Sequence, residues 1–75
     1  MRYVLRKFVN SPNDPVYLMD DGTSETSKLS EAARYPYMVA CAMQRAEWYE
    51  EYGVVNERVA QLEFDQCMAK INHLS

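Results

Sequence analysis

The sequence is poor in the residues from which catalytic and metal sites are most often built. Its 75 residues include two glycines, two cysteines and one histidine. This composition cannot supply a glycine-rich phosphate loop or the closely spaced soft ligands of a zinc site. His73 has no serine or cysteine nucleophile beside it in the sequence, so it is not indicated as a general base. We therefore predict that the protein is not an enzyme and has no catalytic residues, bound metal or cofactor.

The remaining candidate metal ligands have ordinary structural explanations. Cys41 and Cys67 are too few for a disulfide framework, and both lie in helix-like runs. We expect them to be buried thiols that act as small apolar side chains. Asp20, Asp21 and Glu25 lack the regular alternation of a calcium loop, and turn formation with solvation accounts for them.

The sequence also lacks an excess of positive charge. Eight Lys and Arg residues stand against eleven Asp and Glu residues, which gives a formal net charge of −3. Nucleic-acid binding needs a basic face, so we expect no direct nucleic-acid partner. The one cationic cluster, Arg2 with Arg6 and Lys7, lies on a predicted strand, where we interpret it as charge on a solvated strand edge.

Long apolar runs are missing as well. No stretch approaches the roughly 20 apolar residues that a membrane span needs. The N-terminal run MRYVLRKFVN lacks the apolar core and the small-residue cleavage site of a signal peptide. We expect no membrane association and a cytoplasmic location.

What the sequence does have is the composition of a small folded unit. Hydrophobic residues make up 48% and charged residues 25% of the chain, which is typical of globular proteins. The length suits one core, so we expect a single domain over residues 1–75. Ordering costs about 1.5 kcal/mol per residue, and a core of this size offsets it only narrowly. Partner binding or homodimerisation is therefore expected to supply part of the stability.

The N-terminal part of the chain predicts a β-hairpin. Residues Tyr3–Val9 and Val16–Met19 are rich in β-branched and aromatic side chains and flank the turn-forming run NSPNDP. The two prolines of that run have no N–H group and cannot continue a strand ladder. Asp20–Gly22 then ends the second strand with a turn. Because a hairpin alone is marginally stable, we expect it to pack against a helix.

A polar loop and one long helix are predicted next. Residues Thr23–Ser30 are rich in hydroxyl groups. After them the chain forms either a helical turn capped by Ser30 or a short third strand at Ala33–Tyr35. The main helix is expected over Pro36–Tyr52, with Gly53 as the left-handed residue at its C-terminal end. Its spacing predicts a helix that is nearly buried at its start and amphipathic at its end.

The C-terminal segment fits two structures. Ala60, Phe64 and Cys67 recur at helical intervals, and Asn56 is a suitable N-cap for a second helix. Residues Val54–Phe64 also alternate well enough to form a strand that returns to the sheet. In both cases the fold class is α+β, with an N-terminal β-hairpin packed on one long helix.

The order of these elements resembles that of many small phage and prophage open reading frames. The residues that carry the resemblance are Val16–Gly22, then Glu31–Tyr35, then the helix as far as Gly53. The resemblance covers roughly the first two-thirds of the chain and departs at Pro36 and in the acidic C-terminal third. Such proteins commonly serve host takeover or anti-defence by occupying a surface of a host enzyme. The resemblance therefore implies a stoichiometric inhibitor.

The end of the main helix is the most partner-like segment of the chain. Tryptophan and tyrosine are the side chains that most often anchor interfaces, and interleaved carboxylates suit a partner with a basic surface, such as a nucleic-acid-binding enzyme. The alternative is that the rings pack on the hairpin and the carboxylates are merely solvated. We predict a protein-binding site made of Glu47, Trp48, Tyr49, Glu50, Glu51 and Tyr52.

These observations lead to two hypotheses of function. The first is a small phage-type protein that binds and blocks a host protein of the defence, replication or transcription machinery. The second is a structural or regulatory phage protein that assembles with itself through the apolar helix face and has no host enzyme as target.

Overall fold

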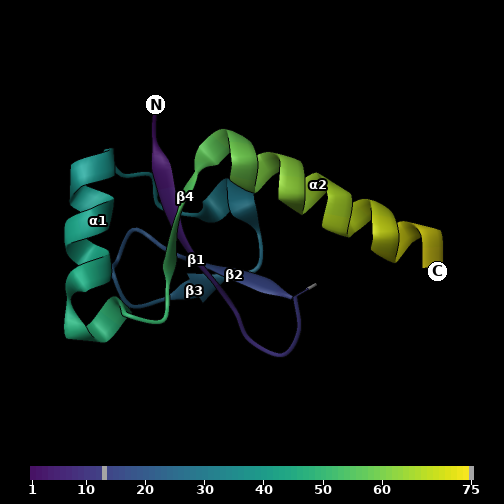
Figure 1. Ribbon diagram of the computed structural model, residues 1–75. Helices are drawn as coiled ribbons and strands as arrows, with labels where there is room; N and C mark the ends of the chain where they lie inside the picture. Colours follow the sequence, from purple (N-terminus) through teal and green to yellow (C-terminus); the bar gives the residue numbers. More distant parts are fainter. Residues whose placement is uncertain (13, 75) are drawn as a thin grey trace.

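The computed structural model describes residues 1–12 and 14–74, and side chains as far as Lys70. The interpretation of His73 therefore lies outside the described side chains. A four-stranded antiparallel sheet is covered by one helix on each face (Figure 1). In chain order the elements are β1 (Tyr3–Phe8), β2 (Pro15–Leu18), β3 (Glu25–Thr26), the 3-10 turn η1 (Leu29–Glu31), α1 (Tyr37–Arg45), the 3-10 turn η2 (Glu47–Tyr49), β4 (Gly53–Asn56) and α2 (Glu57–Leu74). The predicted α+β class is confirmed.

The sheet has the strand order β3-β2-β1-β4. The predicted hairpin forms its centre, with Arg6 opposite Tyr17 in the register of β1 and β2. The expectation that both prolines lie outside the ladder was wrong for Pro15, which begins β2 opposite Phe8; the first residue of a strand is a position where a missing N–H group is tolerated. On the other side of β1, β4 pairs antiparallel, with Val4 opposite Val55. Because β1 is an interior strand, the expectation that its basic residues mark a solvated edge was wrong. The Arg6 side chain instead forms an ion pair with Glu63 of α2.

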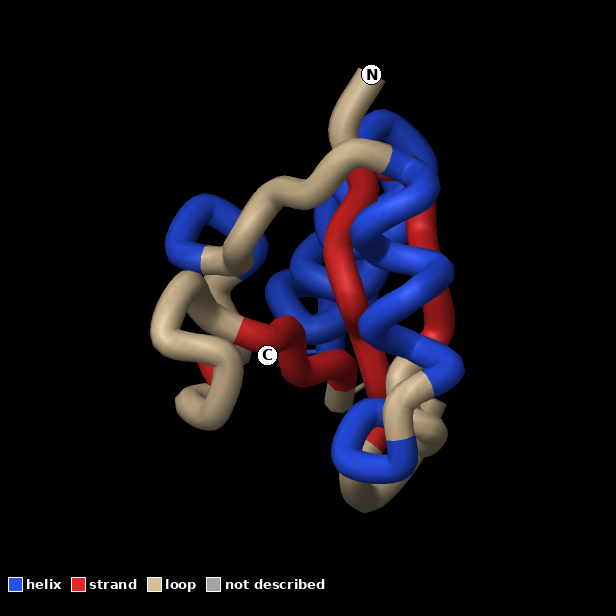
Figure 2. Tube along the Cα trace, turned by 90° about the vertical axis from the view of Figure 1, so that its left-hand side faces the viewer, coloured by secondary structure: helices blue, strands red, loops and turns tan. Residues whose placement is uncertain are grey.

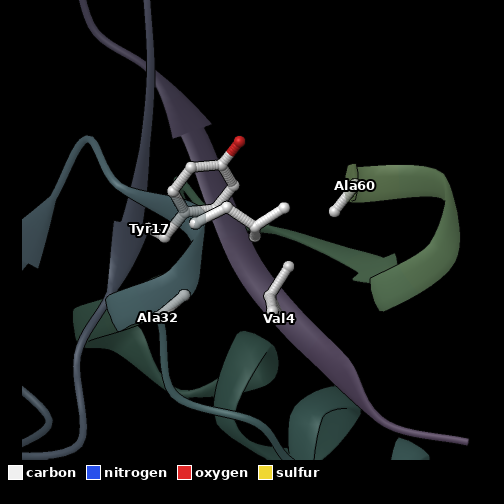
Figure 3. Close-up of a cluster of buried hydrophobic side chains, with 5 residues drawn as sticks. Val4, Tyr17, Ala32 and Ala60 are labelled. Carbon is white, nitrogen blue, oxygen red and sulfur yellow. The ribbon is translucent and has the colours of Figure 1, made fainter. Parts of the chain in front are cut away.

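Two clusters of buried side chains lie on opposite faces of the sheet. Val4 and Tyr17 pack with Ala32 and Ala60 beneath α2 (Figure 3), while Leu5, one residue along β1, packs beneath α1 with Leu18, Ala40 and Tyr52. Successive residues of a strand point to opposite faces. Burial on both faces therefore explains why β1 contains a continuous apolar run instead of a simple alternation of apolar and polar residues.

The main helix is shorter than predicted. It begins after Pro36, as expected, but α1 ends at Arg45, and Ala46 has extended backbone angles of φ −72° and ψ 146°. Gly53 is not left-handed, since Gly22 is the one glycine with positive φ, and it begins β4. Favourable local helix propensity in this segment is outweighed by tertiary contacts of the residues that follow Ala46.

The C-terminal segment combines both predicted alternatives. Gly53–Asn56 is the returning strand, and the helix follows it without a loop. The Asn56 side chain accepts a hydrogen bond of 2.8 Å from the backbone N–H of Arg58, which confirms the predicted N-cap. Of the predicted core positions of this helix, Ala60 is buried and Phe64 is half-buried.

The segment between the hairpin and α1 adds two small pieces of structure. The third strand of the sheet lies within the predicted polar loop, where Glu25 and Thr26 pair with β2. Further on, Tyr35 exchanges two backbone hydrogen bonds of 2.8 and 2.9 Å with Tyr3. The predicted strand at Ala33–Tyr35 is therefore reduced to a single bridge. A short helical turn does form, as the 3-10 turn η1, but the expected cap was wrong: Ser30 lies inside the turn, Lys28 takes the N-cap position, and no side chain caps it.

The outer surfaces of both helices are open. The prediction that the main helix is buried at its start was wrong: Met38 is 83% exposed, and Ala40 is the one residue of α1 that is buried. The reason is that α1 covers one face of the sheet, and no described element covers α1 in turn (Figure 2). Within the described residues, none of the helices has both the length and the apolar character required to cross a membrane.

Candidate functional site

The turn between β2 and β3 is the fixed part of the candidate site. The carboxylate of Asp21 accepts hydrogen bonds from the backbone N–H groups of Thr23 and Ser24, at 3.0 and 2.7 Å, and from the Ser24 hydroxyl. These bonds, the Ser24 hydroxyl first, lower the pKa of Asp21 to about 2. Gly22 takes a left-handed conformation with φ 77°, which a residue without a Cβ adopts readily.

Two tyrosines attach the predicted binding segment to this turn and to β3. The Tyr49 hydroxyl donates a 2.6 Å hydrogen bond to the backbone carbonyl of Gly22, and the Tyr52 hydroxyl donates to the carboxylate of Glu25. The two rings lie 6.1 Å apart at an interplanar angle of 58°. These contacts, together with the break at Ala46, hold the segment in place.

A group of partly exposed charged side chains lies beside the Tyr52 ring. The Lys7 ammonium group is 2.8 Å from the Glu25 carboxylate, 3.6 Å from that of Glu51, and 5.0 Å from the centre of the Tyr52 ring. The bond to Lys7, followed by the one from Tyr52, lowers the pKa of Glu25, and the same bond to Glu25 raises the pKa of Lys7. Burial, and then the bond to Glu25, raises the pKa of Tyr52.

Above this network the surface is hollowed. The aromatic hollow, as we name it, has a volume of about 300 Å³ and is lined chiefly by Lys7, Glu25, Trp48, Tyr49, Glu51 and Tyr52. Trp48 stands at its rim with 84% of its surface exposed. Exposed carboxylates of Glu47, Glu50 and Glu51 belong to the same segment.

The structure separates the six predicted binding residues into two groups. Tyr52 is buried and Tyr49 is half-buried, so both attach the segment to the sheet, as the structural alternative proposed for the rings. Trp48 does not pack on the hairpin and remains exposed together with the three glutamates. The outward-facing surface of the segment is therefore one indole ring surrounded by carboxylates.

Three residues of this site were missed by the sequence analysis. Lys7 follows Leu5 by two positions on β1, so the alternation of a strand could have placed it on the face of α1. Glu25 was assigned to a solvated turn, and its role depends on the pairing of β3, which no local signal predicts. Gly22 contributes its backbone carbonyl, and an acceptor of this kind has no signature in sequence.

In the described part of the chain, no three His, Cys, Asp or Glu side chains come together as the ligands of a metal ion. Cys41 and Cys67 are half-buried, not fully buried as expected. Each lies on a helix in which a single described residue is fully buried, Ala40 in α1 and Ala60 in α2.

Comparison with known proteins adds no relative to these observations. No family model matches the sequence, and neither a curated protein nor a solved structure matches it. The functional interpretation therefore rests on the geometry of the aromatic hollow and of the segment around Trp48.

Proposed function

We propose that the protein is a small inhibitor-type binding module that acts by occupying a surface of another protein through the outer face of residues 47–52. The observation that carries the proposal is the 84% exposure of Trp48. Tryptophan is among the residues most enriched at interface hot spots. Tyr49 and Tyr52 hold the backbone on which the indole is presented, so its position is established before a partner binds.

The charges around Trp48 support a partner with a basic surface. Glu47, Glu50 and Glu51 are exposed, and within the described residues no cation lies at ion-pair distance from Glu47 or Glu50. Carboxylates at the rim of an interface steer association with a positively charged partner and suppress other partners. With the resemblance to phage proteins, this points to a host protein in the cytoplasm as the target.

An interface of ordinary size would bury a sizeable fraction of the accessible surface of this small chain. A specific interface takes about 800 Å² from each partner, which is roughly 15% of the 5274 Å² surface of this chain. One six-residue segment is too small for that area. The interface would therefore extend onto the exposed turn residues Asp21, Thr23 and Ser24, of which Thr23 lines the same hollow.

Affinity capture with paired variants tests the proposal. The wild-type protein is expected to retain a specific bacterial protein, and the variant with Trp48→Ala and Glu47→Lys is expected to lose it. Truncating a hot-spot residue costs about 2 kcal/mol or more, which is roughly a 30-fold loss of affinity. The matched control is Leu62→Ala with Asp65→Lys, which makes the same kinds of change on the exposed surface of α2.

Two results would contradict the proposal. If the Trp48 and Glu47 variant kept its partner at undiminished affinity, the binding surface would lie elsewhere. If no protein were retained by the wild type, the inhibitor hypothesis would give way to self-assembly.

Self-assembly is the second candidate function, and the outer surface of α1 favours it. Tyr37 and Met38 are 57% and 83% exposed, and Val39 is 44% exposed, so three consecutive large apolar side chains face solvent. Burying such a surface against a second copy would give a symmetric dimer. Light scattering tests this candidate: a mass of 8.8 kDa at tens of micromolar would contradict it, and Met38→Glu should dissociate any dimer that forms.

A further inference from the structure

The aromatic hollow has the chemistry of a cation site. Its lining combines the rings of Trp48, Tyr49 and Tyr52 with the carboxylates of Glu25 and Glu51. The face of an aromatic ring attracts a cation, most strongly in the case of tryptophan, and an adjacent carboxylate adds direct electrostatic attraction. Rings and carboxylates arranged around one hollow therefore favour a positively charged side chain over a neutral one.

One half of this site already holds a cation of the chain itself. The Lys7 ammonium group lies over the Tyr52 ring, with its centre 5.0 Å away, and 2.8 Å from the Glu25 carboxylate. The same Glu25 carboxylate also accepts the hydrogen bond from the Tyr52 hydroxyl. The position of Lys7 shows that the walls of the hollow accommodate a cation stacked on a ring beside a carboxylate.

The other half is open. The side chain of Glu51 is 77% exposed, and at 3.6 Å its contact with Lys7 is longer than that of Glu25. No ring or cation of the described residues stacks on Trp48. Trp48 thus provides an indole face on which no described ring or cation stacks, and Glu51 provides an exposed carboxylate that shares Lys7 with Glu25.

Local charge favours a second cation from outside. Near the hollow, the carboxylates of Glu47 and Glu50 add to that of Glu51, whereas Lys7 is the one cation in the lining. Arginine suits the open half better than lysine. Its planar guanidinium group stacks on an indole, binds a carboxylate through two N–H groups and is less strongly hydrated than an ammonium group.

We propose that the aromatic hollow binds an arginine side chain of the partner protein, with its guanidinium group between the indole of Trp48 and the carboxylate of Glu51. This inference rests on the proposed binding function and names the chemistry of its central contact. The partner would therefore carry an arginine whose side chain is extended and mostly exposed on the partner's surface.

Trp48 provides the assay, because it is the only tryptophan of the chain. The probe is the blocked peptide acetyl-Gly-Gly-Arg-Gly-Gly-amide, compared with the same peptide carrying citrulline, which has a similar shape and no charge, and with the lysine peptide. The arginine peptide should change the emission of Trp48 saturably, the citrulline peptide should not, and the lysine peptide should bind more weakly. Added salt should weaken the arginine response.

A matched pair of variants locates the contact. Glu51→Gln should weaken binding of the arginine peptide about 5-fold or more. The control is Glu31→Gln, the same change on η1, which lies on the α2 side of the sheet, away from the aromatic hollow; it should leave binding unchanged. Equal responses to arginine and citrulline, tighter binding of lysine than of arginine, or an equal effect of the two variants would each overturn the inference.

The outcome is separable from that of the proposed function. If the Trp48 and Glu47 variant loses its captured protein but the arginine peptide gives no saturable change, the inference fails and the binding function stands. If the peptide binds as described and no protein is captured, the cation site stands and the inhibitor function fails.

Discussion

The hydroxyl group of Tyr17 provides a sharp test of how the core is packed. The side chain is 0% exposed and packs with Val4 and Ala60, and within the described residues no hydrogen-bond partner reaches its oxygen. A buried hydroxyl without a partner costs about 1–3 kcal/mol. Tyr17→Phe removes that oxygen and keeps the ring. We therefore expect this substitution to raise the free energy of unfolding by about 1 kcal/mol, at the lower end of that range.

The same substitution at two other tyrosines provides matched controls. The hydroxyls of Tyr49 and Tyr52 donate to Gly22 and Glu25, so Tyr49→Phe and Tyr52→Phe should each lower the free energy of unfolding by about 1 kcal/mol. For a domain of this length, 1 kcal/mol corresponds to a shift of about 4–8 °C in Tm.

Urea and thermal unfolding at pH 7, followed by circular dichroism, would measure all three variants. The expected order of stability places the Tyr17 variant above the wild type and the other two below it. If Tyr17→Phe destabilised the protein as much as Tyr52→Phe does, the reasoning about the unpartnered hydroxyl would be refuted.

Three further predictions concern the turn and the site. A Cβ atom on Gly22, at φ +77°, would lie 3.2 Å from the Tyr49 hydroxyl, so Gly22→Ala should lower the free energy of unfolding by about 1–2 kcal/mol; an unchanged Tm would contradict this. The pKa of Asp21, lowered to about 2 chiefly by its bonds to Ser24, should rise in Ser24→Ala when followed by an NMR titration of the carboxyl carbon. Burial first, and then the bond to its carboxylate neighbour, raises the pKa of Tyr52, so the folded state holds the phenolic proton more tightly than the unfolded state. Its contribution to stability should be complete below the unfolded pKa of about 10 and should decline as the pH rises above that value; unfolding measured between about pH 8 and 11 should show a smaller decline in Tyr52→Phe.

The sequence by itself determined the parts of the fold that depend on neighbouring residues. The hairpin follows from two β-branched runs on either side of the turn-forming run NSPNDP. Pro36 marks the start of α1, and Asn56 marks the start of α2, because fixed φ and side-chain capping act within one helical turn. The exposed position of the acidic segment was also predictable in outline, since three glutamates within five residues are costly to bury.

The tertiary structure decided where the elements end and which side chains meet. Nothing local stops a helix at Ala46; it ends there because the hydroxyls of Tyr49 and Tyr52 bond to the turn and strand at positions 22 and 25. The same contacts bring Lys7 beside residues distant in sequence and leave Trp48 at the rim of the hollow. Contacts between residues 27 positions apart depend on the whole chain being folded, and for this reason propensity and periodicity, which act over a few residues, could not anticipate them.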